Sequence, residues 1–414
     1  YSHFAARAGL VARFRAGARA SGYAAVRALT GEFDGVDLGA RPLRATQAEF
    51  DAAARALPED LIAAIDVAVA NVKKGHEDQL IDGETHREIR TETVPGVIVG
   101  ERTRPLQSVA LYVPRGKGSF PSVAIMLCAP AVVAGVARPI VVTPPGPNGD
   151  VDAATLVAAQ KTGVTEVYRV GGVQAIAALA FGTGEIPRTP KVLGPGNAYV
   201  TAAKRALAGV IDPGVPAGPS ESAILCDGTI HADIAAHDLL IEAEHGPDSC
   251  AVLVATSRDY ARAVAARLPA LVAALPEQRQ AFITENFRER SKILVASDLD
   301  AAIEFVNEFA PEHLEILSDD AEALLERIEN AGETMLGPHA PITLGNFVAG
   351  SNAILPTGGL ARSASCLGVP DFQKRSSFVM ASREGFERLA PAALTLADYE
   401  GFPAHAAAVR RRLS

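Results

Sequence analysis

Between residues 108 and 331, short apolar segments alternate with longer amphipathic ones, and this pattern constrains the fold more than any other feature. Runs such as Pro139-Ile-Val-Val-Thr143 have the length of strands, and the segments between them carry apolar residues at helical spacing. Strands that alternate with helices are typical of a parallel sheet with crossover connections. The alternation falls into two parts, about residues 112–219 and residues 222–331. We therefore predict an α/β protein with two such domains.

The expected elements follow from this spacing. Strands are expected at residues 96–100, 108–113, 139–143, 166–170, 191–193, 222–226, 250–255, 292–295 and 314–317. Helices are expected at residues 4–29, 46–57, 61–74, 121–134, 152–162, 173–181, 198–208, 230–245, 258–275, 299–309 and 320–331. Thr46-x-x-Glu49 is a helix-capping signature, and Pro269 predicts a break in its helix. Residues 75–92 and 337–359 are expected as irregular segments, and the last ~45 residues as helices.

Length and composition limit the classes of protein. The 414 residues are too many for one ordinary core. A net charge of −9 argues against a nucleic-acid partner, which would favour a basic surface. The four cysteines form no CxxC pair, which disfavours a cysteine zinc cage. Neither a signal peptide nor a membrane span is recognisable, so we expect a cytoplasmic protein without a membrane partner.

The segment Glu242-Ala-Glu-His245 is the first candidate site. On a helix, Glu242 and His245 share one face, and a carboxylate with an imidazole can chelate a divalent cation. The same residues could equally form a solvated helix end. Glu312 and His313 are a second candidate, since Glu and His are common general bases. They too could be solvated residues that follow a helix.

Glycine-rich turns and a C-terminal segment add further candidates. Gly171-Gly-Val-Gln174 and Gly194-Pro-Gly-Asn197 each stand between a strand and a helix, where backbone N–H groups can bind phosphate. Neither is a complete GxGxxG, so simple tight turns are an equally good interpretation. Ser220 offers a hydroxyl at the junction of the two α/β parts. The loop 345–359 is long and glycine-rich, and it could be functional or a plain surface connection. Residues 400–405 contain His405, which could be a ligand or a structural histidine.

Several long motifs, in order, resemble the histidinol dehydrogenase family across nearly the whole chain. The matching segments are residues 171–183 (GGVQAIAALAFGT), 194–204 (GPGNAYVTAAK), 217–221 (AGPSE), 243–249 (AEHGPDS), 311–314 (PEHL) and 371–374 (DFQK). The resemblance implies two Rossmann-like, doubly wound parallel-sheet domains with small helical N- and C-terminal extensions. It also implies a homodimer with shared active sites, and NAD- and Zn2+-dependent oxidation of a small-molecule alcohol to a carboxylate through a bound aldehyde.

The resemblance also implies a role for each matching residue. Glu312 would activate water and His313 would accept the proton. The NAD-contacting positions would be Tyr112, Gln174 and Asn197, and Ser220 would bind substrate. Glu400 would bind substrate and His405 would bind zinc, both from the partner subunit. Residues 1–111 with 220–366 would form the metal-binding domain, 112–219 the NAD-binding domain and 367–414 a helical dimerisation segment.

The sequence departs from the family pattern at its metal and substrate positions. The usual zinc ligands Gln, His, Asp and His match Glu242, His245, Asn346 and His405, so a carboxylate and an amide have exchanged places. The exchange conserves the charge of the ligand set, which favours a retained metal site over a decayed one.

Three further departures bear on the substrate. A usual histidine is Ala353, a usual glutamate is Ile342, and a usual Pro-Gly-Gly is Pro114-Arg115-Gly116, followed by Lys117. Fewer acids and more cations match a cationic amino alcohol poorly. Three hypotheses remain: a histidinol dehydrogenase, a paralogue that oxidises a different, anionic alcohol, and a non-catalytic binding protein.

Overall fold

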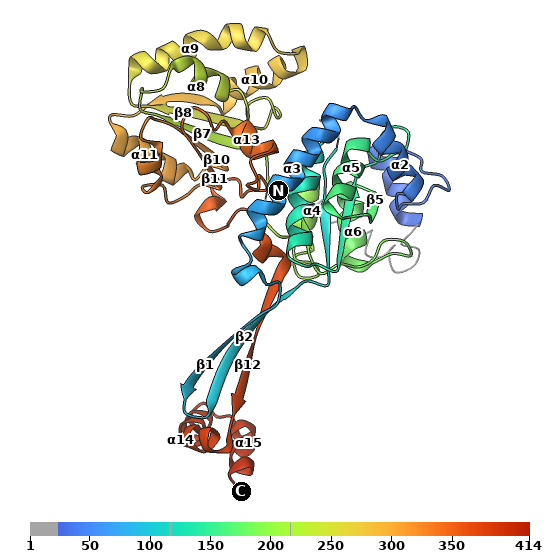
Figure 1. The fold of residues 1–414 in the computed structure, drawn as a ribbon, viewed down its shortest axis with the longest axis vertical. Helices are drawn as coiled ribbons and strands as arrows, with labels where there is room; N and C mark the ends of the chain where they lie inside the picture. Colours follow the sequence, from blue (N-terminus) through green and yellow to red (C-terminus); the bar gives the residue numbers. More distant parts are fainter. Residues whose placement is uncertain (1–23, 116–117, 216) are drawn as a thin grey trace.

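The computed structural model describes residues 24–115, 118–215 and 217–414. Two α/β units lie side by side, and a long antiparallel arm leaves them and ends in two helices (Figure 1). Parallel sheets covered by helices confirm the predicted doubly wound α/β fold. Most of the helix expected at residues 4–29 lies outside the described residues, and residues 24–34 are helical. Among the described residues, no helix combines the length and apolar character needed to cross a membrane.

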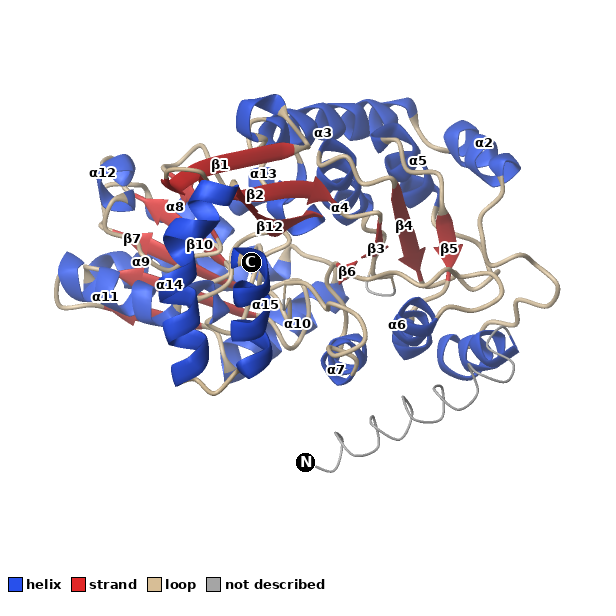
Figure 2. Ribbon diagram, turned by 90° about the horizontal axis from the view of Figure 1, so that it is seen from below, coloured by secondary structure: helices blue, strands red, loops and turns tan. Residues whose placement is uncertain are grey.

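The first unit is a four-stranded parallel sheet in the order β5-β4-β3-β6. Its strands are β3 (Ser108–Tyr112), β4 (Arg138–Thr143), β5 (Val167–Arg169) and β6 (Val192–Leu193). Helices α4 (Pro121–Val133) and α5 (Ala153–Thr162) cover one face, and α6 (Gly172–Phe181) and α7 (Ala198–Ala206) the other (Figure 2). This strand order is that of one half of a Rossmann fold. The strand order reverses between β3 and β6, and folds of this kind bind their ligands at such a point.

The N-terminal helices α2 (Gln47–Ala56) and α3 (Glu59–Glu77) pack on α4 and α5 of this first unit. Their buried residues Phe50, Ile65 and Val72 join the same apolar core as α4. The sequence-based grouping of residues 1–111 with 220–366 is therefore wrong for these helices and for β3. The apolar stripes of these helices could pack on either unit, and only tertiary packing determines which unit they join. The capping box predicted at Thr46 and Glu49 is confirmed.

The second unit is a five-stranded parallel sheet in the order β11-β10-β7-β8-β9. Its strands are β7 (Glu221–Cys226), β8 (Cys250–Ala255), β9 (Lys292–Val295), β10 (His313–Leu317) and β11 (Glu333–Leu336). Helices α8 (Ala232–Asp238), α9 (Arg258–Ala273) and α10 (Glu277–Glu289) cover one face. Helices α11 (Leu299–Phe309) and α12 (Ala321–Leu325) cover the other. Strand β11 and helix α13 (Ile342–Phe347) were not predicted.

The helix expected at residues 230–245 is shorter than predicted, because α8 ends at Asp238 and turns follow to residue 245. The side chain of Asn286 in α10 donates hydrogen bonds to the carbonyl oxygens of Ala243 and Gly246, at 2.6 and 2.8 Å. Arg279 donates to the carbonyl of Glu244 at 2.8 Å. Side chains of α10 thus bind the carbonyl groups of this turn. Helix α9, in contrast, continues through Pro269, where we expected a break.

The arm is a three-stranded antiparallel sheet in the order β1-β2-β12. Its strands are β1 (Arg87–Val94), β2 (Val97–Pro105) and β12 (Gln373–Ala381), and α14 (Arg383–Tyr399) and α15 (Pro403–Leu413) lie at its end (Figure 1). The prediction of a purely helical segment 367–414 is wrong for β12, and β1 occupies part of the expected polar break. Most side chains of β1 and β12 are exposed, so these strands lack the alternating apolar signal of a half-buried strand. Short 3-10 helices occupy Ile81–Gly83, Leu360–Arg362 and Val369–Phe372.

Candidate active site

Acidic and histidine side chains gather at the amino-terminal edge of the five-stranded sheet. Glu221, His313 and Glu333 are the first residues of β7, β10 and β11. The parallel register places His313 beside both Ser222 and Glu333. Ligands of α/β sheets usually bind at the carboxyl ends of the strands. This cluster is at the opposite edge of its sheet, and helix α13 lies over it, on the side that faces the first unit (Figure 1).

Three of the four predicted zinc ligands come together at this edge. The turn after α8 buries Glu242, which is 1% exposed. Its Oε2 lies 3.2 Å from Nδ1 of His245, and its Oε1 accepts a hydrogen bond of 3.0 Å from Nδ2 of Asn346 on α13. The contact between Glu242 and Asn346 joins residues that are 104 positions apart. Because α8 has already ended, the turn and not a helix face brings Glu242 and His245 together.

The donor set fits zinc, which binds imidazole nitrogen and carboxylate oxygen. A carboxylate as buried as that of Glu242 requires a compensating partner, and a cation would supply one. Within the described chain, no group of three or more His, Cys, Asp and Glu side chains is arranged to hold a metal. An amide and a residue from elsewhere would have to complete the site.

The last predicted ligand lies far from the other three. His405 is exposed in the first turn of α15, and its ring contacts that of Phe402 with centroids 5.4 Å apart. Glu400, the C-cap of α14, is also exposed. Both are at the end of the arm, away from α8 and α13 (Figure 1). Within one chain, the structure does not bring Glu400 or His405 to the candidate site.

The Glu312–His313 pair is buried in the same cluster. Oε2 of Glu312 accepts a hydrogen bond of 2.9 Å from the backbone N–H of Glu221. Burial, with a contribution from the charge of Glu242, raises the pKa of Glu312 to about 8. Burial lowers the pKa of His313, but the neighbouring Glu333, Glu242 and Glu312 outweigh it and raise that pKa to about 9. A histidine surrounded by carboxylates binds its proton tightly, so His313 can take a proton from a substrate only after it has lost its own.

Sequence reasoning missed Glu333 and Glu221. Nδ1 of His313 lies 3.3 Å from Oε2 of Glu333, and the Glu333 side chain is 11% exposed. Glu221 accepts a hydrogen bond of 2.7 Å from the backbone N–H of Gly358. One signal could have found Glu221, since one residue separates it from the apolar run 223–226 of a predicted strand. The run after Glu333 was too short to be predicted as a strand.

The three predicted NAD contacts lie at the carboxyl edge of the four-stranded sheet. Tyr112 ends β3, and its hydroxyl accepts a hydrogen bond of 3.1 Å from the backbone N–H of Gly172. Gln174, in the first turn of α6, donates 3.0 Å to Asp34. Asn197 caps α7 by accepting from the N–H groups of Tyr199 and Val200. Tyr112 at the end of β3 and Asn197 after β6 lie on either side of the point where strand order reverses.

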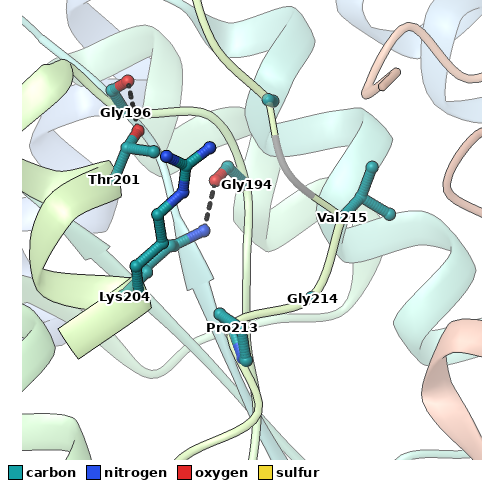
Figure 3. Close-up of a pocket in the computed structure, with 9 residues that line it drawn as sticks. Gly194, Gly196, Thr201, Lys204, Pro213, Gly214 and Val215 are labelled. Carbon is teal, nitrogen blue, oxygen red and sulfur yellow. Dashed lines mark hydrogen bonds between the residues drawn. The ribbon is translucent and has the colours of Figure 1, made fainter. Parts of the chain in front are cut away.

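A small pocket adjoins this edge (Figure 3). Lys204 is 7% exposed, and its Nζ donates a hydrogen bond of 2.6 Å to the carbonyl of Gly194. Burial lowers the pKa of Lys204 to about 8. The pocket is lined by Gly194, Gly196, Thr201, Lys204, Arg205, Pro213, Gly214, Val215 and Ala217. It is continuous with the Gly194–Asn197 turn and therefore belongs to the same candidate cofactor region.

The remaining substrate candidates are distributed over both units. Ser220 directly precedes β7, and its carbonyl accepts a hydrogen bond of 3.0 Å from Cys250. Ile342 is fully buried in α13, and Ala353 packs against the core of the first unit. The Arg115 guanidinium donates 3.0 Å to the carbonyl of Asp150, in the loop after β4. The structure therefore places Arg115 on the first unit, and Lys117 lies outside the described residues.

Comparison with known proteins agrees with this architecture. The family model described as histidinol dehydrogenase matches residues 5–413. This match defines the class of the protein as a dehydrogenase that acts on CH–OH groups. A crystal structure of histidinol dehydrogenase from Elizabethkingia anophelis superposes with a TM-score of 0.91 at 32% identity, covering 98% of this chain and 92% of that one.

Two curated relatives are more similar in sequence. A protein of Cereibacter sphaeroides named histidinol dehydrogenase homolog is 50% identical over 368 residues, which is 89% of this chain and 82% of that protein. The histidinol dehydrogenase of Synechocystis is 45% identical over 381 residues, 92% of this chain and 87% of its own length. The chain belongs to the histidinol dehydrogenase family.

Proposed function

We propose that this protein oxidises a small-molecule alcohol to a carboxylate through a bound aldehyde, with NAD and zinc, and that the family reaction, L-histidinol to L-histidine, is the first candidate. One observation carries the proposal. The Glu312–His313 pair and the Glu242, His245 and Asn346 group meet at one edge of one sheet. A proton acceptor beside a set of metal-binding donors is the arrangement that alcohol oxidation requires.

His313 would take the first proton. The alcohol O–H loses its proton to the imidazole while hydride leaves the same carbon, which gives the aldehyde. Glu312 would then remove a proton from water as its oxygen adds to the aldehyde carbon. Loss of a second hydride from the resulting hydrate anion gives the carboxylic acid. The burial of Glu312 and the charges around it raise its proton affinity, which suits it to this role.

Zinc and NAD would supply the rest of the chemistry. Zinc held by Glu242, His245, Asn346 and the partner's His405 would polarise the alcohol oxygen. NAD bound along the carboxyl edge of the first sheet would accept both hydrides, with Tyr112, Gln174 and Asn197 at its site. The position of that edge at the reversal of strand order supports this assignment. Ser220 and the partner's Glu400 would hold the substrate.

The same proposal includes a homodimer that shares its active sites. The arm extends away from both α/β units, so it can reach a second chain (Figure 1). Large apolar side chains on it are exposed, among them Val379 at 69%, Leu396 at 60% and Tyr399 at 89%. Exposed apolar surface of this kind is typical of a subunit interface. The position of His405 on this arm would complete the metal site of the partner.

A second candidate is a different, anionic alcohol. Ala353 and Ile342 stand where the family has a histidine and an acid, which favours this substrate class. Arg115 supports it less than the sequence suggested, because its guanidinium is bound to the loop of Asp150. A non-catalytic role is disfavoured by the buried Glu312–His313 pair.

The test is a steady-state screen of NAD reduction with histidinol and with carboxylated and sulfonated alcohols, with and without added zinc. Parent enzyme and His237→Asn, an exposed histidine of the same unit, should be equally active. His313→Asn should lose at least about 100-fold in kcat. Turnover of histidinol alone would eliminate the second candidate. Failure of every alcohol to reduce NAD, in a protein that holds zinc, would contradict the proposed function.

A further inference from the structure

The Glu333 carboxylate is held against His313 by the fold. Parallel pairing of β10 with β11 places the two residues beside each other on one face of the sheet. The backbone N–H of Glu333 donates 3.0 Å to the carbonyl of Glu312, which fixes the start of β11. On its other side, a Cβ atom at Gly345 would lie 2.8 Å from both carboxylate oxygens. The carboxylate therefore lies between the imidazole of His313 and the backbone of α13.

The two facing atoms depend on each other. His313 Nδ1 and Glu333 Oε2 are 3.3 Å apart, and their side chains are 3% and 11% exposed. Both atoms are buried, and in the described part of the chain neither makes a hydrogen bond of good geometry, their 3.3 Å contact included. A buried polar atom without a partner is destabilising, so each is expected to be satisfied by the other. At this exposure their attraction is only weakly screened by solvent.

From this geometry we infer that Glu333 is the positioning residue of His313. It receives the Nδ1 proton, fixes the orientation of the ring, and leaves Nε2 as the proton-accepting nitrogen. It also stabilises the imidazolium that forms when His313 takes the alcohol proton. A base oriented by a third group in this way is a recurring arrangement in enzymes. The inference rests on the proposed role of His313, and it adds a residue that the family resemblance did not assign.

Two substitutions separate the contributions of Glu333. Glu333→Gln keeps an oxygen that accepts the Nδ1 proton but removes the charge, whereas Glu333→Leu removes both. Glu333→Leu should lower kcat about 100-fold, and Glu333→Gln about tenfold, with KM for NAD unchanged. The matched control is Glu326→Gln, at an exposed position that follows α12, which should keep the parent kcat. A Glu333→Leu enzyme with the parent kcat, or with equal losses in kcat and in NAD affinity, would overturn the inference.

A second readout does not require activity. Nitrogen-15 NMR of the histidine rings, recorded above pH 9 with His313→Asn to assign the signal, reports which ring nitrogen carries the proton. The parent should show the Nδ1–H tautomer, Glu333→Gln should retain it, and Glu333→Leu should shift toward Nε2–H. An Nε2–H tautomer in the parent would refute the inference even if alcohols are oxidised. The expected tautomers in a protein that oxidises no alcohol would instead contradict only the proposed function. If Glu333→Leu does not fold, Glu333→Gln and the parent tautomer decide the matter.

Discussion

Replacing Glu242 by glutamine should weaken metal binding strongly while it preserves the shape of the site. Glu242 is 1% exposed and contacts both His245 and Asn346, at 3.2 and 3.0 Å, so it is at the centre of the donor group. It is also the only carboxylate among the four proposed ligands. Loss of an outer-shell partner costs 10–100-fold in metal affinity, and loss of a charged ligand should reach at least the upper end of that range. We expect at least about 100-fold, or about 2.7 kcal/mol.

Replacing Asn346 by aspartate should strengthen zinc binding, which is the opposite of the effect expected for Glu242→Gln. Asn346→Asp places a second carboxylate about 3.0 Å from Glu242. Without metal, the two like charges should destabilise the fold, and zinc should relieve that repulsion. The double variant Glu242→Gln/Asn346→Asp restores one carboxylate and one amide, so its affinity should return toward that of the parent.

Chelator competition gives these affinities, with the zinc-induced change in melting temperature as a second measure. The zinc-induced shift should be smallest in Glu242→Gln and largest in Asn346→Asp. Equal zinc affinity in Glu242→Gln and the parent would refute the assignment of Glu242 as a ligand. A double variant that binds no better than Glu242→Gln would refute the exchange of ligand roles.

Three further predictions concern the positioning residue, the first unit and the arm. Gly345→Ala should lower kcat at least about tenfold, because its Cβ would displace Glu333, and circular dichroism should show an intact fold. Glu49→Gln should destabilise the protein by about 2 kcal/mol in urea titrations, because Glu49 is the bidentate partner of the fully buried Arg169. The same ion pair lowers the pKa of Glu49 to about 2. The contribution of this pair to stability should therefore be complete above pH 4.5 and fall as the pH decreases toward 2. Glu49→Gln should lack this pH dependence. Val379→Asp, at an exposed arm position, should convert dimer to monomer in sedimentation experiments, and an unchanged oligomeric state would argue against the arm as the interface.

Local sequence patterns predicted a segment correctly where its structure depends on its own residues or near neighbours in the sequence. The strand around Val141 is buried on both faces, and its continuous apolar run predicts it directly. The capping box of Thr46 and Glu49 involves neighbours in sequence, so its prediction needed no tertiary information. The strand–helix alternation likewise predicted both parallel sheets.

Long-range contacts determined the features that the sequence did not reveal. The turn after α8 is bound by Asn286, which is 43 residues from Ala243 in the sequence. Strand β12 exists because it pairs with β2, more than 260 positions earlier. Glu333 enters the site through the register of β11, which no local pattern specifies. The connection between His405 and Glu242 came only from the family resemblance.

We propose that each active site combines Glu242, His245 and Asn346 of one chain with the partner's His405. Mixed dimers of His245→Asn and His405→Asn, isolated by a different affinity tag on each chain, test it directly. Each variant alone should be inactive, because every site lacks one ligand. In the mixed dimer one site lacks both ligands and the other is intact, so about half of the parent's activity per dimer should return. A mixed dimer as inactive as its parents would show that both histidines serve the same chain, and would contradict the shared site.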